Sequence, residues 1–230
     1  MQYSRTLSEL TNHLSLTLLA GLLLACAAHA APPATDPNDP VAVATQSLST
    51  LSNLATKDTY AELGFQSLAE VGKAKLGSAV SVYMIQLNEL KTLDPAADPK
   101  SVMHDLKEKL FPVHVGGSTR TAIVVRQDTA GKWAMASVGD AATVKLLDEV
   151  RGLHSKATGK THEYILVKIP AIYQMFLART DGDGKMHLIT LREDKALGTA
   201  KKGEERPSKT VLELLQKLAK DFKPLEKPGN

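Results

Sequence analysis

The sequence has little cysteine, few aromatic residues and no marked excess of charge of one sign. Of its 230 residues one is cysteine and 4% are aromatic, and 28 basic residues nearly balance 25 acidic ones. The scarcity of aromatic rings weakens the case for carbohydrate or single-stranded nucleic-acid recognition, which commonly stack on such rings. The balanced charge argues against a nucleic-acid partner in general. The remaining composition is that of an ordinary globular protein.

Long apolar runs are absent too, except near the N-terminus. Residues 14–28 carry no charge, and Ala28-His29-Ala30 supplies the small residues that a signal peptidase recognises. A run of about 15 residues is short for a membrane span, which needs about 20, and is typical of the centre of a signal peptide. We therefore expect residues 1–30 to be a signal peptide cleaved after Ala30. The mature protein is then periplasmic or secreted.

The single cysteine, Cys26, lies inside this segment and leaves an alternative open. Leu23-Leu24-Ala25-Cys26 resembles the bacterial lipobox, in which the cysteine is acylated and becomes the mature N-terminus. An acylated Cys26 would tether the protein to a membrane, whereas cleavage after Ala30 would not. Under either hypothesis the folded domain has no cysteine. Disulfides, thiolate catalysis and cysteine-based metal sites are therefore excluded there.

The rest of the chain predicts one α+β domain. Residues 31–40 are rich in proline and typical of a linker, and residues 41–222 are expected to form a single domain. Two lobes meeting near residues 140–160 are the alternative, and residues 223–230 are expected to fray. Apolar residues recur at helical spacing after Asp39, after Asp140 and after Thr210. Segments typical of strands are residues 79–87, 111–115, 119–126, 132–138, 164–169, 172–178 and 186–191.

The order of these segments predicts the architecture. Strands joined by hairpin turns, with helices mainly at the two ends, favour a mostly antiparallel sheet with helices packed on it. We expect those helices on one face of the sheet, with N- and C-terminal helices flanking it. Asp98-Pro99 predicts a further helix with Val102, Met103, Leu106 and Leu110 on one face. Thr210 and Glu213 have the spacing of a capping box at the start of the last helix.

Motifs for catalysis and for cofactors are missing. There is no Gly-x-Ser-x-Gly, no phosphate-binding loop ending in Lys-Ser or Lys-Thr, and no histidine pair at metal-ligand spacing. The run Asp181-Gly182-Asp183-Gly184 is more typical of a tight turn than of a calcium loop, because no distal carboxylate follows at the required spacing. We expect no catalytic residue, no metal and no cofactor. Dispersed active sites leave no motif, so the sequence leans against an enzyme without excluding one.

Five residues are the candidates for ligand binding. Gly116 and Gly117 could form a backbone nest for an anion with Arg120 and His114 beside it, although a hairpin turn explains the glycines equally well. Trp133 is the candidate platform for a ligand, with a place on the sheet or in the core as the alternative.

The export signal and the missing catalytic motifs favour a non-catalytic binding or interaction module of the bacterial cell envelope. Its partner would be an envelope protein or a small ligand, with no nucleic acid, and a membrane only if Cys26 is acylated. One alternative is an envelope protein anchored by lipid through Cys26. Another is a hydrolase with a dispersed site, using His114 or His187 with a carboxylate. The binding hypothesis predicts an exposed apolar patch or an unpaired strand edge.

Overall fold

The computed structural model describes residues 36–94, 96–159, 162–198 and 200–222. Its helices are α1 (Pro40–Leu54), α2 (Leu68–Val71), α3 (Leu87–Thr92), α4 (Ala141–Thr158) and α5 (Ser208–Asp221), with short 3-10 turns η1 (Pro99–Val102), η2 (Pro170–Ile172) and η3 (Lys195–Leu197). Its strands are β1 (Lys75–Leu76), β2 (Val80–Met84), β3 (His104–Val115), β4 (Ser118–Gln127), β5 (Trp133–Gly139), β6 (Ile165–Ile169), β7 (Gln174–Thr180), β8 (Met186–Thr190) and β9 (Glu205–Pro207). None of the helices described combines the length and apolarity of a membrane span.

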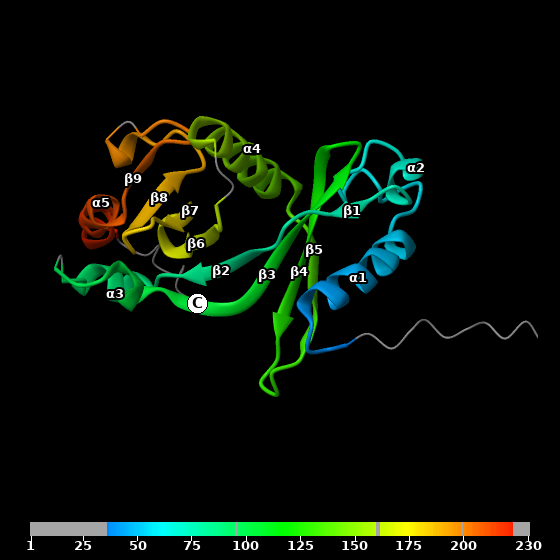
Figure 1. The fold of residues 1–230 in the computed structure, drawn as a ribbon, viewed down its shortest axis with the longest axis horizontal. Helices are drawn as coiled ribbons and strands as arrows, with labels where there is room; N and C mark the ends of the chain where they lie inside the picture. The colour runs from blue at the N-terminus through cyan, green and yellow to red at the C-terminus, as the bar shows by residue number, and fades with distance from the viewer. Residues whose placement is uncertain (1–35, 95, 160–161, 199, 223–230) are drawn as a thin grey trace, which may run out of the picture. The chain divides into compact units, whose positions relative to one another are not determined.

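The strands form one nine-stranded sheet with the order β5-β4-β3-β2-β6-β7-β8-β9, and β1 pairs with β3 off this path. Every pair is antiparallel except β2 with β6. In that pair Ser81 lies opposite Ile165 and Met84 opposite Lys168. The mostly antiparallel sheet, with helices on it and at both ends of the described chain, confirms the predicted α+β class (Figure 1).

Two of the helices begin where capping residues predict. The Asp39 side chain accepts a hydrogen bond from the backbone N–H of Val41 at 2.8 Å, and Pro40 occupies the first position of α1. Asp140 accepts from the backbone N–H of Thr143 at 3.3 Å at the start of α4. At its far end, α4 stops at Gly159, whose φ of 65° is the left-handed conformation that favours glycine.

Helices cover both faces of the sheet, so the expectation of one covered face is wrong. Leu110 of β3 packs with Val144 and Leu147 of α4, whereas the next residue, Phe111, packs with the cluster under α1. Successive strand residues point to opposite faces, so α4 lies on one face and α1 on the other. By the same alternation in β6, α5 lies on the face opposite α4. Figure 1 shows α1 and α4 on opposite sides of the β3-β4-β5 strands.

The helix predicted after Asp98 is wrong. Asp98 does cap a turn, because its carboxylate accepts from the backbone N–H of Lys100 at 2.9 Å, but this 3-10 turn ends at Val102. Strand β3 then begins at His104. Leu106 and Leu110 are four residues apart, and that spacing places two side chains on one face in a helix and in a strand alike. The apolar spacing therefore could not distinguish the two structures.

The capping box at Thr210 is wrong as well. Helix α5 begins two residues earlier, at Ser208, directly after strand β9, and its N-cap residue Pro207 makes no side-chain capping bond. Thr210 and Glu213 both lie exposed inside the helix. Pro207 ends the strand and starts the helix, since its fixed φ and missing N–H suit that junction.

Leu147 gives a test of how α4 packs. It is fully buried, so Leu147→Ala should lower the free energy of unfolding by about 2–5 kcal/mol through lost burial and the cavity left behind. Leu153, on the same helix, is 47% exposed, and Leu153→Ala should change that free energy by less than about 0.5 kcal/mol. Urea unfolding followed by circular dichroism measures both. Equal losses for the two variants would contradict the assignment of the buried face.

Candidate functional site

A strip along the middle of the sheet, on the face opposite α4, is not fully covered by helices. The α1 cluster there involves β3, β4 and β5, and the α5 cluster involves β6, β7 and β8. Between them Ser81 and Tyr83 of β2 and Lys109 of β3 are only partly buried. Ser81 and Tyr83 alternate with Val80 and Val82, which pack under α4, so they face away from that helix. We call this surface the open strip.

An apolar cavity of about 420 Å³ lies on the open strip. Its lining residues come from β2, the η1 segment, the start of β6, the β7–β8 hairpin and Glu163 before β6: Tyr83, Lys100, Met103, Glu163, Ile165, Ala178, Arg179, Thr180 and Met186. The side chains of Met103, Ile165 and Met186 and the ring of Tyr83 offer an apolar wall. A volume of this size is in the range of pockets that hold small organic molecules.

Three polar side chains on this cavity have no hydrogen-bond or ion-pair partner among the described residues. The Tyr83 hydroxyl, the Lys100 amine and the Glu163 carboxylate make no hydrogen bond or ion pair with any residue that the structure describes. Lys100 and Glu163 are exposed, and Tyr83 is half-buried. The cavity therefore pairs apolar walls with a few polar groups that are free to orient a ligand.

A second hollow, the polar hollow, adjoins the cavity on the same strip. It measures about 200 Å³ and is lined by Ser81, Asp105, Lys107, Glu108, Lys109, Gln127 and Trp133. The Lys109 amine donates to the Ser81 hydroxyl at 3.0 Å. Ser81 lines this hollow and Tyr83 lines the apolar cavity. Ser81 and Tyr83 are two residues apart on one strand, so their Cα atoms lie roughly 7 Å from each other. One elongated ligand would therefore reach both hollows.

Charge in the polar hollow is partly cancelled. Lys107 and Asp105 form an ion pair at 2.8 Å. Partial burial acts to raise the pKa of Asp105, but hydrogen bonds from the side chain and backbone of Lys107 outweigh it and hold that pKa below its ordinary value. The same hydrogen bond raises the pKa of Lys107. Within the described chain Lys109 forms no ion pair, although its charge also helps to lower the pKa of Asp105. It is therefore the cation of this hollow that is best placed to meet an anion.

The structure places Trp133 apart from the other four candidate ligand-binding residues, which lie at or beside the β3–β4 turn. Trp133 lines the polar hollow and is half-buried beside the α1 cluster. Gly116 and Gly117 form the turn between β3 and β4, with φ of 57° and 80°. This turn lies at the end of β4 opposite to the end that pairs with Trp133. The Arg120 guanidinium donates to both oxygens of the Glu70 carboxylate, at 2.8 and 3.1 Å, and these bonds lower the pKa of Glu70. Arg120 thus fastens α2 to β4.

His114, the remaining candidate, does meet a carboxylate. Its Nε2 lies 3.4 Å from Asp148 Oδ2 and its Nδ1 lies 3.3 Å from the Thr119 hydroxyl. The Thr119 hydroxyl, however, donates its proton to Asp148 at 2.5 Å. A nucleophilic hydroxyl needs to donate to the base that activates it, so this contact is not arranged as a catalytic triad.

His187 belongs to a larger polar cluster between α4 and strands β7, β8 and β9. Glu205 is its centre: Oε2 lies 2.5 Å from His154 Nε2, while Oε1 lies 2.6 Å from the Arg179 guanidinium and 3.3 Å from His187 Nδ1. The other ring nitrogen of His187 lies 3.1 Å from Asp181. Of these residues only Arg179 also lines a cavity described above, so the cluster mainly holds β9 against α4.

Neither histidine cluster forms a metal centre. Across the described ranges, no three side chains of histidine, cysteine, aspartate or glutamate are placed to hold a metal ion. Asp181 instead organises the turn between β7 and β8, because its carboxylate accepts from the backbone N–H groups of Asp183 and Lys185 at 3.0 and 2.8 Å. This agrees with the tight turn predicted from the Asp-Gly repeat.

Sequence patterns did not identify most of the open strip. Tyr83, Lys109, Ile165 and Met186 carry no motif, and they come together only through strand pairing. One signal was present: Ser81 interrupts an apolar strand that is predicted to be central, and a polar residue at such a place marks a face that helices leave open.

Glu205 predicts how stability depends on pH. Partial burial acts to raise its pKa, but the hydrogen bond from His154 and the charge of Arg179 outweigh that effect and hold the pKa below the ordinary 4.5. A lowered carboxyl pKa stabilises the fold above the unfolded-state pKa, and this contribution is lost as pH falls through the folded-state pKa. Glu205→Gln should cost about 2 kcal/mol of unfolding free energy at neutral pH, and the gap to the natural protein should narrow below pH 4.5.

Urea unfolding measured between neutral and acidic pH tests this expectation. Glu149→Gln is the matched control, because the Glu149 side chain is 50% exposed and its pair with Lys202 is superficial. That change should cost no more than about 0.5 kcal/mol at any pH. A gap for Glu205→Gln that does not vary with pH would contradict the role given to its charge.

Known proteins supply no template for the open strip. Neither a protein-family model, nor a curated protein, nor a solved structure matches this chain significantly. The function is therefore inferred from the geometry of its surface.

Proposed function

We propose that the chain is a non-catalytic binding module that holds a small amphipathic ligand on the open strip of its sheet. The apolar cavity of about 420 Å³ carries this proposal, because its apolar walls are combined with polar side chains that have no partner within the described residues. A cavity of this kind gains stability when an apolar ligand covers its walls, at about 25 cal/mol for each Å² removed from water. The ligand would be oriented by hydrogen bonds from its own polar groups to Lys100, Glu163 and the Tyr83 hydroxyl.

The polar hollow narrows the chemistry of that ligand. Lys107 is paired with Asp105, whereas Lys109 donates only to the Ser81 hydroxyl within the described chain. A ligand with an apolar body in the cavity and an anionic group in the hollow would satisfy both regions. Trp133 beside Lys109 adds an apolar surface against which a flat or extended ligand can pack.

We further propose that this module works in the cell envelope after export. The signal peptide predicted from the sequence at residues 1–30 supports this proposal; it lies outside the described residues, as does Cys26. Cleavage after Ala30 would release the module into the periplasm, and acylation of Cys26 would hold it at a membrane. An exported binding module and an anchored one would share the same open strip.

Calorimetric titration with anilinonaphthalene sulfonate, an anionic amphiphile, tests the binding site. We expect one equivalent to bind the folded protein. Thr180 is exposed, lines the cavity and shares a face of β7 with Phe176 and Ala178, so Thr180→Trp should fill the cavity and weaken binding at least tenfold. Lys109→Gln should weaken binding about threefold to tenfold, because it removes the charge that meets the sulfonate.

Two control variants make matched changes elsewhere. Asn53→Trp adds an indole at an exposed position of α1, and Lys73→Gln removes an exposed lysine beyond α2. Both should bind the probe within twofold of the natural protein. Equal binding by Thr180→Trp and Asn53→Trp would overturn the assignment of the cavity, and so would binding with no fixed stoichiometry.

Intact mass spectrometry tests the export proposal. The full chain, expressed in a bacterial host, should yield a periplasmic form that begins at Ala31, because Ala28 and Ala30 present the small residues that the peptidase requires. Cys26→Ser should leave this mass and its location unchanged. A membrane-bound product that begins at an acylated Cys26, and that disappears in Cys26→Ser, would replace release with lipid anchoring.

A further inference from the structure

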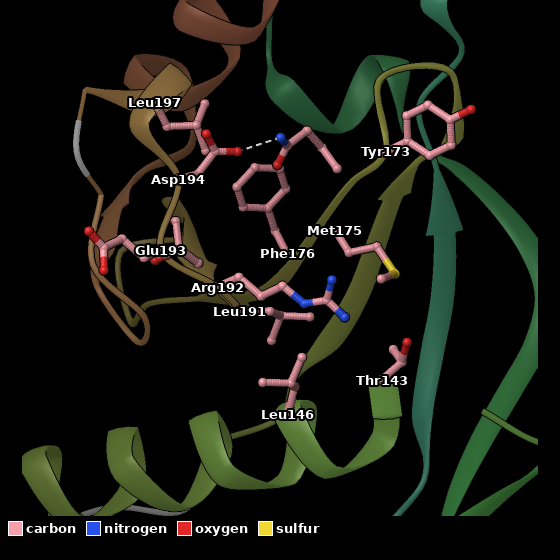
Figure 2. A pocket seen from close by; sticks show the side chains of 12 residues that line it. Thr143, Leu146, Tyr173, Met175, Phe176, Leu191, Arg192, Glu193, Asp194 and Leu197 are labelled. Carbon is pink, nitrogen blue, oxygen red and sulfur yellow. Dashed lines mark hydrogen bonds between the residues drawn. The ribbon is translucent and has the colours of Figure 1, made fainter. Parts of the chain in front are cut away.

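A third hollow, of about 130 Å³, lies where the first turns of α4 meet the start of β7 and the segment after β8 (Figure 2). None of its lining residues lines the apolar cavity or the polar hollow. Leu146, Met175 and Leu191 give it apolar walls. Its volume has room for roughly four water-sized groups, far less than the apolar cavity. We call it the α4 pocket.

Arg192 distinguishes the α4 pocket from other arginine sites in this protein. The part of the chain that the structure describes contains six arginines, and five of them pair with a carboxylate: Arg120, Arg126, Arg151, Arg179 and Arg206. Arg192 makes no ion pair or hydrogen bond with the described residues, and Figure 2 shows its side chain running between Leu191 and Met175. A planar guanidinium beside apolar walls is well suited to bind one carboxylate through two parallel hydrogen bonds.

Thr143 is an independent sign of a ligand. Its side chain lines the pocket and the residue is only 6% exposed, yet its hydroxyl has no hydrogen-bond partner within the described chain. The hydroxyl is not one of the fully enclosed polar atoms without a partner in the described chain, so it is accessible from the pocket, where a ligand can accept its proton. In Figure 2 the Thr143 side chain rises from α4 toward the guanidinium end of Arg192. Both residues line the same small pocket.

The charges around the pocket leave those donors available. The N-terminus of the 18-residue helix α4 adds partial positive charge, which Asp140 partly offsets as the capping residue. Asp194 also lines the pocket, but its carboxylate accepts from the Gln174 amide at 2.5 Å. Glu193 is exposed, and Figure 2 shows its carboxylate turned away from Arg192.

We propose that the α4 pocket is a second binding site, specific for a short aliphatic carboxylate. The carboxylate is held by the Arg192 guanidinium and the Thr143 hydroxyl, and the alkyl chain packs on Leu146, Met175 and Leu191. The small volume restricts the chain to a few carbons. This site is separate from the open strip, so the protein has two places for ligands of different size.

Titrations followed by NMR chemical shifts test the proposal with butyrate and with butyramide, its neutral analogue of the same shape. Butyrate should bind at least tenfold more tightly than butyramide, with the largest shifts at the start of α4 and at residues 190–192. Arg192→Gln should abolish that preference. Thr143→Val, which keeps the side-chain shape, should weaken butyrate binding about threefold or more.

Lys195→Gln is the matched control, because it removes an exposed cation three residues beyond Arg192 that does not line the pocket. It should leave butyrate binding within twofold of the natural protein. Equal affinity for butyrate and butyramide, no saturable binding, or full binding by Arg192→Gln would each overturn the proposal. Failure here would leave the binding of anilinonaphthalene sulfonate to the open strip unaffected, so the two sites are tested separately.

Discussion

The single parallel pair in the sheet, β2 with β6, constrains the rest of the structure. Neighbouring parallel strands cannot be joined by a tight turn, so the chain must leave the end of β2 and cross back before β6 begins. That connection contains helix α3, the turn η1, strands β3, β4 and β5, and helix α4. Because α4 returns the chain to β6, it lies across one face of the sheet, where Val144, Leu147 and Val150 bury Val82 and Leu166. The position of α4 thus fixes which face is left for the other helices.

The open strip follows from that arrangement. Helix α1 covers the strands that precede α4, and α3 and α5 cover those that follow it. Neither group fully covers the face of β2 that carries Ser81 and Tyr83, which is where the two strand groups join, although Tyr83 packs against the α5 cluster. Polar residues can occupy this place because water reaches it, and the apolar wall beside it is left incompletely packed. The open strip is therefore a consequence of how the sheet is connected.

Much of the fold could be predicted because it depends on local patterns. The hairpin strands follow from turn residues such as Gly116-Gly117, and the limits of α1 and α4 follow from Asp39 and Asp140. The failures were local ambiguities: the spacing of Leu106 and Leu110 suits a helix and a strand equally. At α5 a strand leads directly into the helix, which begins at Ser208. The capping box predicted two residues later therefore does not mark the start of the helix.

The candidate site could not be predicted in the same way. Its residues come from separate segments, and the register of strand pairing decides which of them meet: Ser81 lies opposite Lys109, and Gln127 opposite Trp133. Trp133 could be selected from the sequence because it is the single tryptophan, yet nothing in the sequence indicated Lys109 as its neighbour. His114 and Asp148 illustrate the same limit, because 33 intervening residues, from 115 to 147, separate a pair that touches in the fold.

Ion pairing distinguishes the cations that join elements of this protein from those that line its hollows. Where a cation holds elements together it has a carboxylate partner, as Arg120 has Glu70 and Arg179 has Glu205. Lys109 and Arg192 have no such partner within the described residues, and each lines a hollow with apolar surface nearby. Evenly neutralised charge would leave no reason for an anion to bind at one place over another. The near balance of the whole chain extends to the linings of both hollows, which hold at least as many acidic as basic residues. The proposed preference for anionic ligands therefore depends on the position of single cations that form no ion pair, and not on an excess of positive charge.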